Sequence, residues 1–162
     1  MTPTLDELRQ EEDSLHLSHF DYATAWELGS SLRAKAVEAG LPVGIEVFHG
    51  SAPVFLSLLP GSTPDNVDWL RRKRAVALRF HHSSLYMRRL CEAKGVEFAM
   101  RYHLPASDFV ASGGAVPITV RGSGVVGVVT VSGLPDTEDH AMVVAALRAL
   151  NEGHSRIRPL VS

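Results

Sequence analysis

The chain has 162 residues, a formal net charge of −2 and 45% hydrophobic residues. This length and composition are typical of one globular domain that buries its own core, and we expect a single domain over residues 1–162. A nucleic-acid-binding face needs a local excess of basic residues, which this charge does not indicate. Cys91 is the only cysteine, so a disulfide within the chain is excluded and a reducing compartment is favoured.

The N-terminal residues, Met1 to Leu8, are acidic and lack the apolar segment of a secretory signal. No apolar run reaches the roughly 18–20 residues that a membrane-spanning helix needs. We therefore expect a cytoplasmic protein that has no membrane partner.

Two helices are predicted before the first strand. Residues 5–14 form a short charged helix. The second helix begins after Asp21, a good N-cap, and ends near Gly40, because glycine readily adopts the left-handed conformation that terminates helices. Residues 43–48 and 53–59 then form two strands joined by a tight connection.

A long helix follows Thr63-Pro64, where threonine caps the helix and proline occupies its first turn. Its periodicity is interrupted near residues 81–84 and stops at Gly95. Trp69 shares a face of this helix with Val76 and Phe80, so we expect Trp69 to be mostly buried and to contribute to stability as a core side chain does.

A second hairpin and a last helix complete the pattern. Residues 116–120 and 125–131 are rich in β-branched side chains and are separated by a short glycine turn, which predicts two adjacent antiparallel strands. Asp136 is expected to cap a final helix that ends at Gly153. Strands in adjacent pairs favour an α+β fold in which helices pack on an antiparallel, profilin-like sheet.

Four consecutive basic residues, Arg71 to Arg74, are the most unusual feature of the long helix. Successive helical residues are about 100° apart, so these four surround almost the whole circumference and cannot all remain in water. One interpretation is a solvated face on which Asp65 and Asp68 pair with the basic residues. In the other, Arg72 and Lys73 hold a ligand that bears a carboxylate. The run also predicts an oligomer, because a monomer would struggle to solvate all four charges.

His81-His82-Ser83-Ser84 follows at the interruption of the long helix. Adjacent helical histidines point about 100° apart, and the chain has no His-x-x-x-His pair, so we expect no metal site. A single imidazole is nevertheless sufficient to bind haem iron through one axial bond. The alternative is that these histidines make structural hydrogen bonds.

A further group of candidates surrounds the second hairpin and the start of the last helix. The passage from a strand through a turn into a helix leaves backbone N–H groups that can bind an anion. The alternative is that the side chains of this group tie the last helix to the sheet. Ser132 lacks the glycine-flanked elbow of a serine nucleophile, so no catalytic residue is predicted. The group comprises Gly113, Gly114, Ser132, Gly133, Asp139 and His140.

Together these stretches resemble the family of small proteins that includes HbpS, GlcG and the C-terminal domain of PduO, which are called haem-degrading domain proteins. The resemblance rests on Pro64 to Asn66, Trp69, Arg72-Lys73, Arg79 to Ser84, Gly113 to Ile118, Gly124 to Gly127, Val131 to Pro135 and Asp139-His140. It implies a profilin-like fold, assembly into dimers or larger rings, and haem binding.

Three functions are compatible with these residues. In the first, the protein binds or degrades haem, with Arg72 and Lys73 pairing with the propionates and His81 or His82 as the axial ligand. Ser83 and Ser84 would lie beside that ligand. In the second, the protein is a non-enzymatic oligomeric scaffold whose basic helix lies at a subunit interface. In the third, it binds a small carboxylate.

Overall fold

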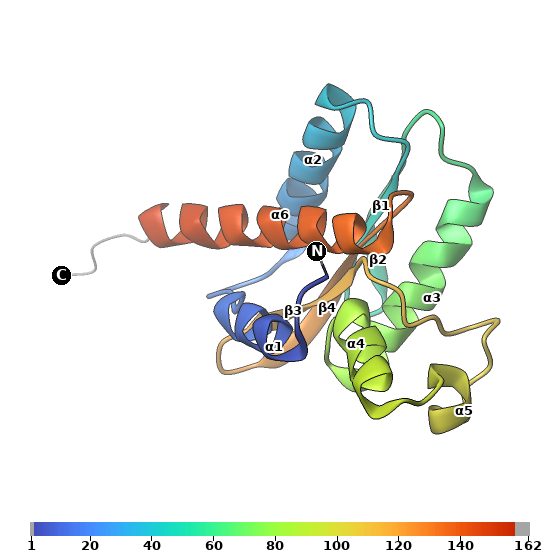
Figure 1. The fold of residues 1–162 in the computed structure, drawn as a ribbon. Helices are drawn as coiled ribbons and strands as arrows, with labels where there is room; N and C mark the ends of the chain where they lie inside the picture. The colour runs from blue at the N-terminus through green and yellow to red at the C-terminus, as the bar shows by residue number, and fades with distance from the viewer. Residues whose placement is uncertain (1, 158–162) are drawn as a thin grey trace.

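A computed structural model describes residues 2–157 as a sheet covered by helices (Figure 1). The elements in chain order are α1 (Leu5–Ser14), α2 (Tyr22–Glu38), β1 (Gly44–His49), β2 (Ala52–Leu58), α3 (Pro64–Phe80), α4 (Ser84–Lys94), α5 (Phe98–Tyr102), β3 (Ala115–Val120), β4 (Gly124–Ser132) and α6 (Asp136–Ile157). Within residues 2–157, no helix combines the length and the apolarity needed to cross a membrane.

The sheet has four strands in the order β2-β1-β4-β3, and every neighbouring pair is antiparallel. The two hairpins, β1–β2 and β3–β4, therefore join through their first and last strands, with Gly44 opposite Ser132. This arrangement confirms the predicted α+β fold with an antiparallel sheet. The sheet places the C-terminal end of β4 beside the start of β1, in the centre of the molecule.

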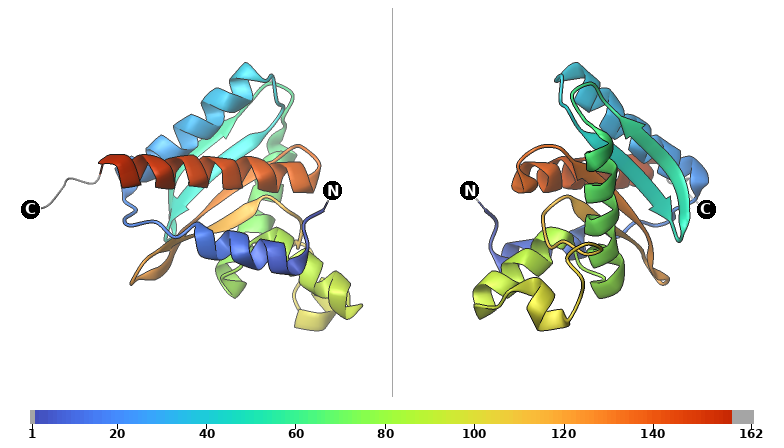
Figure 2. Two further views of the ribbon diagram at one scale, coloured as in Figure 1. Left: turned by 60° about the vertical axis from the view of Figure 1, so that its left-hand side comes forward. Right: turned by 90° about the vertical axis from the view of Figure 1, so that its right-hand side faces the viewer.

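Helices cover both faces of the sheet (Figure 2). Side chains alternate between the two faces of a strand, and Ile45 and Val47 of β1 lie in the main core with α2 and α6. On the opposite face, Ala77 of α3 packs against Ala115 and Val128 of the sheet. The long helix α3 therefore lies directly on the strands, which explains why one side of its basic run is buried.

A second, smaller core lies where α1, α4 and α5 gather around the C-terminal half of α3. Its most buried members include Leu8 of α1, Val76 of α3 and Leu85 of α4. This core holds α1 against α4. The break between α3 and α4 allows the packing, because His81 ends α3 in a left-handed conformation (φ 56°) and Ser83 caps the next helix.

Two local expectations were wrong, and a third holds only in part. Trp69 is largely buried but lies outside the hydrophobic core, and its indole Nε1–H donates to Asp65 Oδ2 (3.2 Å). Helix α6 continues through Gly153 to Ile157, because a glycine inside a helix costs only about 1 kcal/mol and does not force an end. Asp136 is the first helical residue of α6, and its carboxylate accepts a hydrogen bond from the Gly113 N–H instead of capping its own helix.

Candidate functional site

Six of the twelve candidate residues from the sequence line two hollows that share no lining residue. The first, called here the histidine hollow, has a volume of about 250 Å³ and lies between the end of α1, the α3–α4 break and the β3–β4 hairpin. It is lined by Glu12, Asp13, Leu15, His16, His81, His82, Val116, Pro117, Thr119, Gly124 and Val125.

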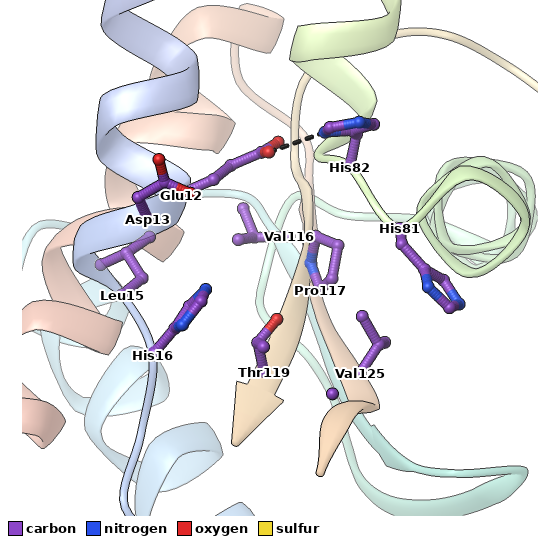
Figure 3. Close-up of a pocket in the computed structure, with 11 residues that line it drawn as sticks. Glu12, Asp13, Leu15, His16, His81, His82, Val116, Pro117, Thr119 and Val125 are labelled. Atoms are coloured by element: carbon purple, nitrogen blue, oxygen red, sulfur yellow. Dashed lines mark hydrogen bonds and ion pairs between the residues drawn. The ribbon is translucent and has the colours of Figure 1, made fainter. Parts of the chain in front are cut away.

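His82 is held in place on one wall of the histidine hollow. Its Nδ1 lies 2.7 Å from Glu12 Oε2 (Figure 3). The His82 ring also stacks on Tyr86, with centroids 4.1 Å apart. The other oxygen of the same carboxylate, Glu12 Oε1, accepts the Ser83 N–H at 2.7 Å. Glu12 of α1 thus fixes both the imidazole and the start of α4, so His82 helps to shape the hollow.

His81 and His16 are the less constrained imidazoles of this hollow. In Figure 3, the His81 ring points away from Glu12 and lies on the opposite side of the hollow from His16. Within residues 2–157, neither the His81 nor the His16 side chain makes a hydrogen bond. The neighbouring wall includes Leu15, Val116 and Pro117 and is apolar. Haem needs an axial ligand for its iron and apolar contacts for its porphyrin ring, and the two imidazoles and the apolar wall are of these kinds.

The charged groups of the histidine hollow do not complete a propionate site. The carboxylates of Glu12 and Asp13 line it, and neither Arg72 nor Lys73 does. Glu12 is already engaged by His82 and Ser83. The arrangement therefore suits a ligand whose apolar body enters the hollow while its own carboxylates remain in solvent.

The second hollow, called here the lysine hollow, has a volume of about 270 Å³ and is lined mainly by polar residues. Lys73 forms its floor and is buried, with Nζ 3.0 Å from Asp139 Oδ2 and 3.3 Å from the Val131 carbonyl oxygen. The lining residues are Asp65, Asn66, Trp69, Lys73, Ser112, Ser132, Gly133, Leu134, Asp136 and Asp139.

The anion at the turn before α6 is a side chain of the protein itself. Asp139 accepts hydrogen bonds from the backbone N–H groups of Gly133 (3.3 Å) and Leu134 (3.0 Å). Burial raises the pKa of Asp139 and lowers that of Lys73, while the opposite charge of each partner counteracts the shift. The N–H groups that could have bound an external anion are therefore occupied.

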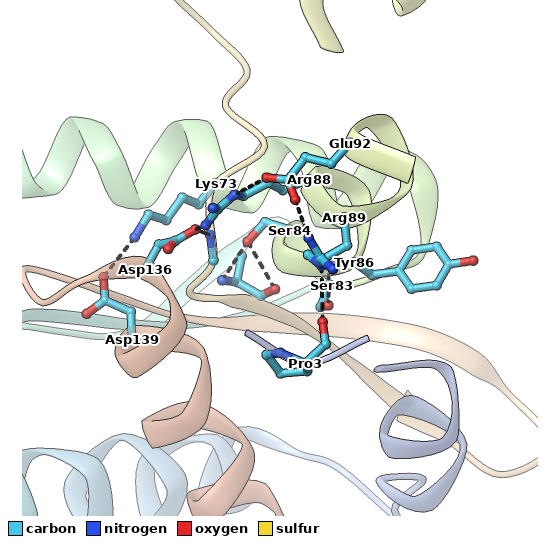
Figure 4. A network of polar contacts seen from close by, with 12 residues as sticks. Pro3, Lys73, Ser83, Ser84, Tyr86, Arg88, Arg89, Glu92, Asp136 and Asp139 are labelled. Carbon is cyan, nitrogen blue, oxygen red and sulfur yellow. Dashed lines mark hydrogen bonds and ion pairs between the residues drawn. The ribbon is translucent and has the colours of Figure 1, made fainter. Parts of the chain in front are cut away.

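Asp136 extends this polar network toward α4 (Figure 4). Its Oδ2 accepts the Gly113 N–H at 3.0 Å and lies 2.5 Å from Arg88 Nη1. Burial favours a higher pKa, but the Gly113 N–H and the Arg88 guanidinium outweigh it and lower the pKa of Asp136. Gly114 follows in the same segment, with Lys73 Nζ close to the position that a Cβ atom would take. Asp65, Asp136 and Asp139 outnumber Lys73, which makes the lysine hollow a poor site for a small carboxylate.

Ser83, Ser84 and His140 are buried, and their side chains make polar contacts within the protein. Ser83 Oγ accepts the Tyr86 N–H and caps α4, and Ser84 Oγ accepts the Ala115 N–H at 3.0 Å. His140 Nε2 lies 2.5 Å from Glu11 Oε1 and so ties α6 to α1. Ser132 lines the lysine hollow, where its carbonyl oxygen accepts the Asn66 side chain.

The basic run of α3 is neutralised by the chain's own carboxylates. Arg71 and Arg72 both pair with Asp68, at 2.8 and 2.9 Å, and the Arg72 guanidinium lies 4.3 Å from the centre of the Trp69 ring. Arg74 pairs with Glu46 of β1. The run therefore needs no partner subunit to compensate its charge, and the sequence-based argument for an oligomer loses its basis.

Two important carboxylates were missed from the sequence. Glu12 organises the histidine hollow, and its only signal was its place in an acidic helix. Glu46 is buried in the centre of β1, and burial raises its pKa against the opposing effect of Arg74. A glutamate between Ile45 and Val47 in an apolar strand was the signal that could have identified it. In the part of the chain that the structure describes, no three His, Cys, Asp or Glu side chains gather to hold a metal ion.

Comparison with known proteins gives concordant matches. A family model described as haem-degrading protein HbpS-like matches residues 20–148. The chain is 46% identical to a UPF0303 protein of Streptomyces avermitilis over 145 residues, which covers 90% of this chain and 89% of that protein. The crystal structure of Ybr137w protein superposes with a TM-score of 0.86 at 32% identity, covering 96% of this chain and 91% of that one. The crystal structure of a PduOC–haem complex has the same fold, with a TM-score of 0.69 at 16% identity over 82% of this chain and 95% of that chain.

Proposed function

The chain belongs to the HbpS-like family of haem-degrading proteins, and we propose that it binds haem in the histidine hollow. The observation that carries this proposal is His81, an exposed imidazole that lines the hollow beside an apolar wall. The structure of PduOC with haem supports it, because that protein shares this fold. Haem would supply an iron that accepts an axial imidazole nitrogen.

The three histidines of the hollow would have different roles. His81 is the first candidate ligand, and His16 on the facing wall is the second. His82 is engaged by Glu12, so it would position the wall of the site and leave the iron to its neighbours. Arg72 and Lys73 are paired with Asp68 and Asp139, so we assign the propionates to solvent at the mouth of the hollow.

A haemin titration followed at the Soret band tests this assignment. His81→Ala should change the Soret maximum and weaken binding by about tenfold or more, because an iron–nitrogen bond is lost. His103→Ala is a matched control, since His103 also ends a helix in a left-handed conformation (φ 54°) and is exposed, but lies outside the hollow. Its titration should match that of the parent.

Two results would count against the proposal. The haem assignment fails if the parent gives no saturable Soret shift at micromolar haemin. The ligand assignment fails if His81→Ala and His16→Ala, alone and combined, keep the parent spectrum and affinity. His82→Ala should alter affinity less than His81→Ala, and the reverse order would transfer the axial bond to His82.

A further inference from the structure

Strand β2 forms an edge of the sheet, and the two edges differ in how they are covered. At the β3 edge, the Leu17 N–H donates to the Thr119 carbonyl (2.8 Å) and the Arg121 N–H donates to the Leu17 carbonyl (2.9 Å). Within residues 2–157, no backbone group outside β1 pairs with the backbone of β2. An open edge is a template for pairing with another strand.

The hydrogen-bond phase of the β1–β2 ladder identifies the groups that face outward. The Leu59 N–H donates to the Val43 carbonyl just beyond the strands, so that pair is a hydrogen-bonded one. Hydrogen-bonded and non-hydrogen-bonded pairs alternate along an antiparallel ladder. The Gly44–Leu58 and Glu46–Leu56 pairs are therefore non-hydrogen-bonded. It follows that Leu56 and Leu58 direct their N–H and C=O groups to the open edge.

Large apolar side chains are exposed near this edge on both faces of the sheet. Leu56 is 57% exposed and Leu58 is 44% exposed on the α3 face, while Trp26 of α2 is 60% exposed on the other face, beside Phe55. Hollows of about 560 and 360 Å³ flank the strand, and Leu56 lines both. Natural sheet edges are usually guarded by charge or proline. Within Ala52–Leu58 only Pro53, near the start of the strand, provides such a guard and no residue is charged, while Arg33 of α2 reaches this edge and donates from Nε to Ser57 Oγ (3.2 Å).

We propose that β2 is the docking surface for a second copy of this chain, with the two β2 strands paired antiparallel about a two-fold axis through Ser57. In this register Leu56 of one copy lies opposite Leu58 of the other, and each of these pairs exchanges two N–H···O bonds through the groups that face outward. The same two leucines meet their counterparts on the α3 face. Because one patch supplies both halves of the contact, the interface is self-complementary.

Ser57 gives a direct test of the register. In the proposed pairing, the two Ser57 residues form a non-hydrogen-bonded pair, whose Cβ atoms are typically about 4.5–5.5 Å apart. That spacing is near the range that a disulfide bridges. Ser57→Cys should therefore form a covalent dimer on mild oxidation, since the native Cys91 is buried. Ser123→Cys, on the exposed β3–β4 turn, is the control and should not cross-link at comparable concentration.

Light scattering after gel filtration tests the interface itself. The parent should have a mass of at least twice 17.6 kDa. Leu56→Lys should lower the mass, because it places like charges at the interface, while Met100→Lys should not, although Met100 is 76% exposed on α5. Both substitutions are at exposed positions, so both variants should keep the parent melting temperature.

Three outcomes would overturn the inference: a parent monomer at every concentration, a Leu56→Lys protein of parent mass, or an oligomer in which Ser57→Cys does not cross-link. Haem binding is a separate proposal. A monomeric Leu56→Lys protein that still binds haemin supports both, and a parent oligomer without haem binding rejects only the haem assignment.

Discussion

Lys73 and Asp139 form an ion pair in the interior, with 3.0 Å between Nζ and Oδ2 and side-chain exposures of only 3% and 1%. The lysine comes from α3 on one face of the sheet, and the aspartate comes from the first turns of α6. Two charges that leave water lose hydration, which their mutual attraction offsets only if further hydrogen bonds form. The Val131 carbonyl provides such a bond to Lys73, and the Gly133 and Leu134 N–H groups provide them to Asp139.

Replacement of one residue of the pair should therefore lower the free energy of unfolding by more than half of the loss caused by replacing both. Lys73→Met and Asp139→Asn should each lower the free energy of unfolding by about 3–5 kcal/mol, because each leaves a buried group without its counter-charge. The double variant should lose less than the sum of the two. Urea unfolding of the four proteins measures this coupling, and additive losses would show that the pair does not act as a unit.

The sequence predicted that one basic residue of α3 would leave water but did not identify its partner. Four basic residues around one helix cannot all remain in water, which left a carboxylate of the chain, a partner chain or an anionic ligand as the counter-charge, and Lys73 is the residue that is buried. Its partner lies 66 residues away, in an element whose position depends on the strand order of the sheet. Periodicity is a local signal and carries no information on such contacts.

The local character of sequence signals also explains which other features were predicted and which were not. Helices and strands were largely predicted because caps and alternation are local, as at Asp21, Thr63 and Gly95. The histidine hollow could not be predicted, since it forms only when α1 packs on α4 and brings Glu12 to His82. Trp69 is largely buried as expected but lies outside the core, because helical spacing identifies a face of α3 but not where the sheet beneath that face ends.

Trp69 should contribute less to stability than its smaller neighbour Leu70. Trp69 lies outside the core and packs under the Arg72 guanidinium, so Trp69→Ala should cost roughly 1–2 kcal/mol. Leu70 is fully buried, and Leu70→Ala should cost about 2–5 kcal/mol. Chemical unfolding of both variants checks the order. A greater loss for Trp69→Ala would mean that the indole contributes as much packing as a core side chain.

Glu46 should make stability fall as the pH rises above the ordinary glutamate range. Burial raises its pKa although Arg74 opposes the shift, so the folded protein keeps this proton at a pH where the unfolded chain has released it. The stabilisation is fully present below the unfolded pKa and is lost as the pH rises through the folded one.

Glu46→Gln isolates this effect from the other carboxylates. The unfolding free energy of the parent minus that of Glu46→Gln should be largest near about pH 4 and should decrease toward about pH 7. Urea titrations of both proteins across this range measure the difference. A difference that increases with pH would instead show that the ion pair with Arg74 dominates over burial.

Gly114 should tolerate alanine less well than Gly122, although both have a positive φ, of 138° and 81°. A left-handed backbone alone costs a residue with a side chain about 1–2 kcal/mol. This is the loss expected for Gly122→Ala, because a Cβ atom at Gly122 would meet nothing within 4 Å.

At Gly114 the Cβ atom would lie 2.3 Å from the Val131 carbonyl oxygen and 2.9 Å from Lys73 Nζ. The lysine can shift only by weakening its contact with Asp139, and the carbonyl belongs to the central strand β4. Gly114→Ala should therefore exceed the loss of Gly122→Ala by at least about 1–3 kcal/mol, as overpacking of a core does. Thermal unfolding of the two variants decides the matter, and equal melting temperatures would mean that the segment before β3 has room to move away from the ion pair.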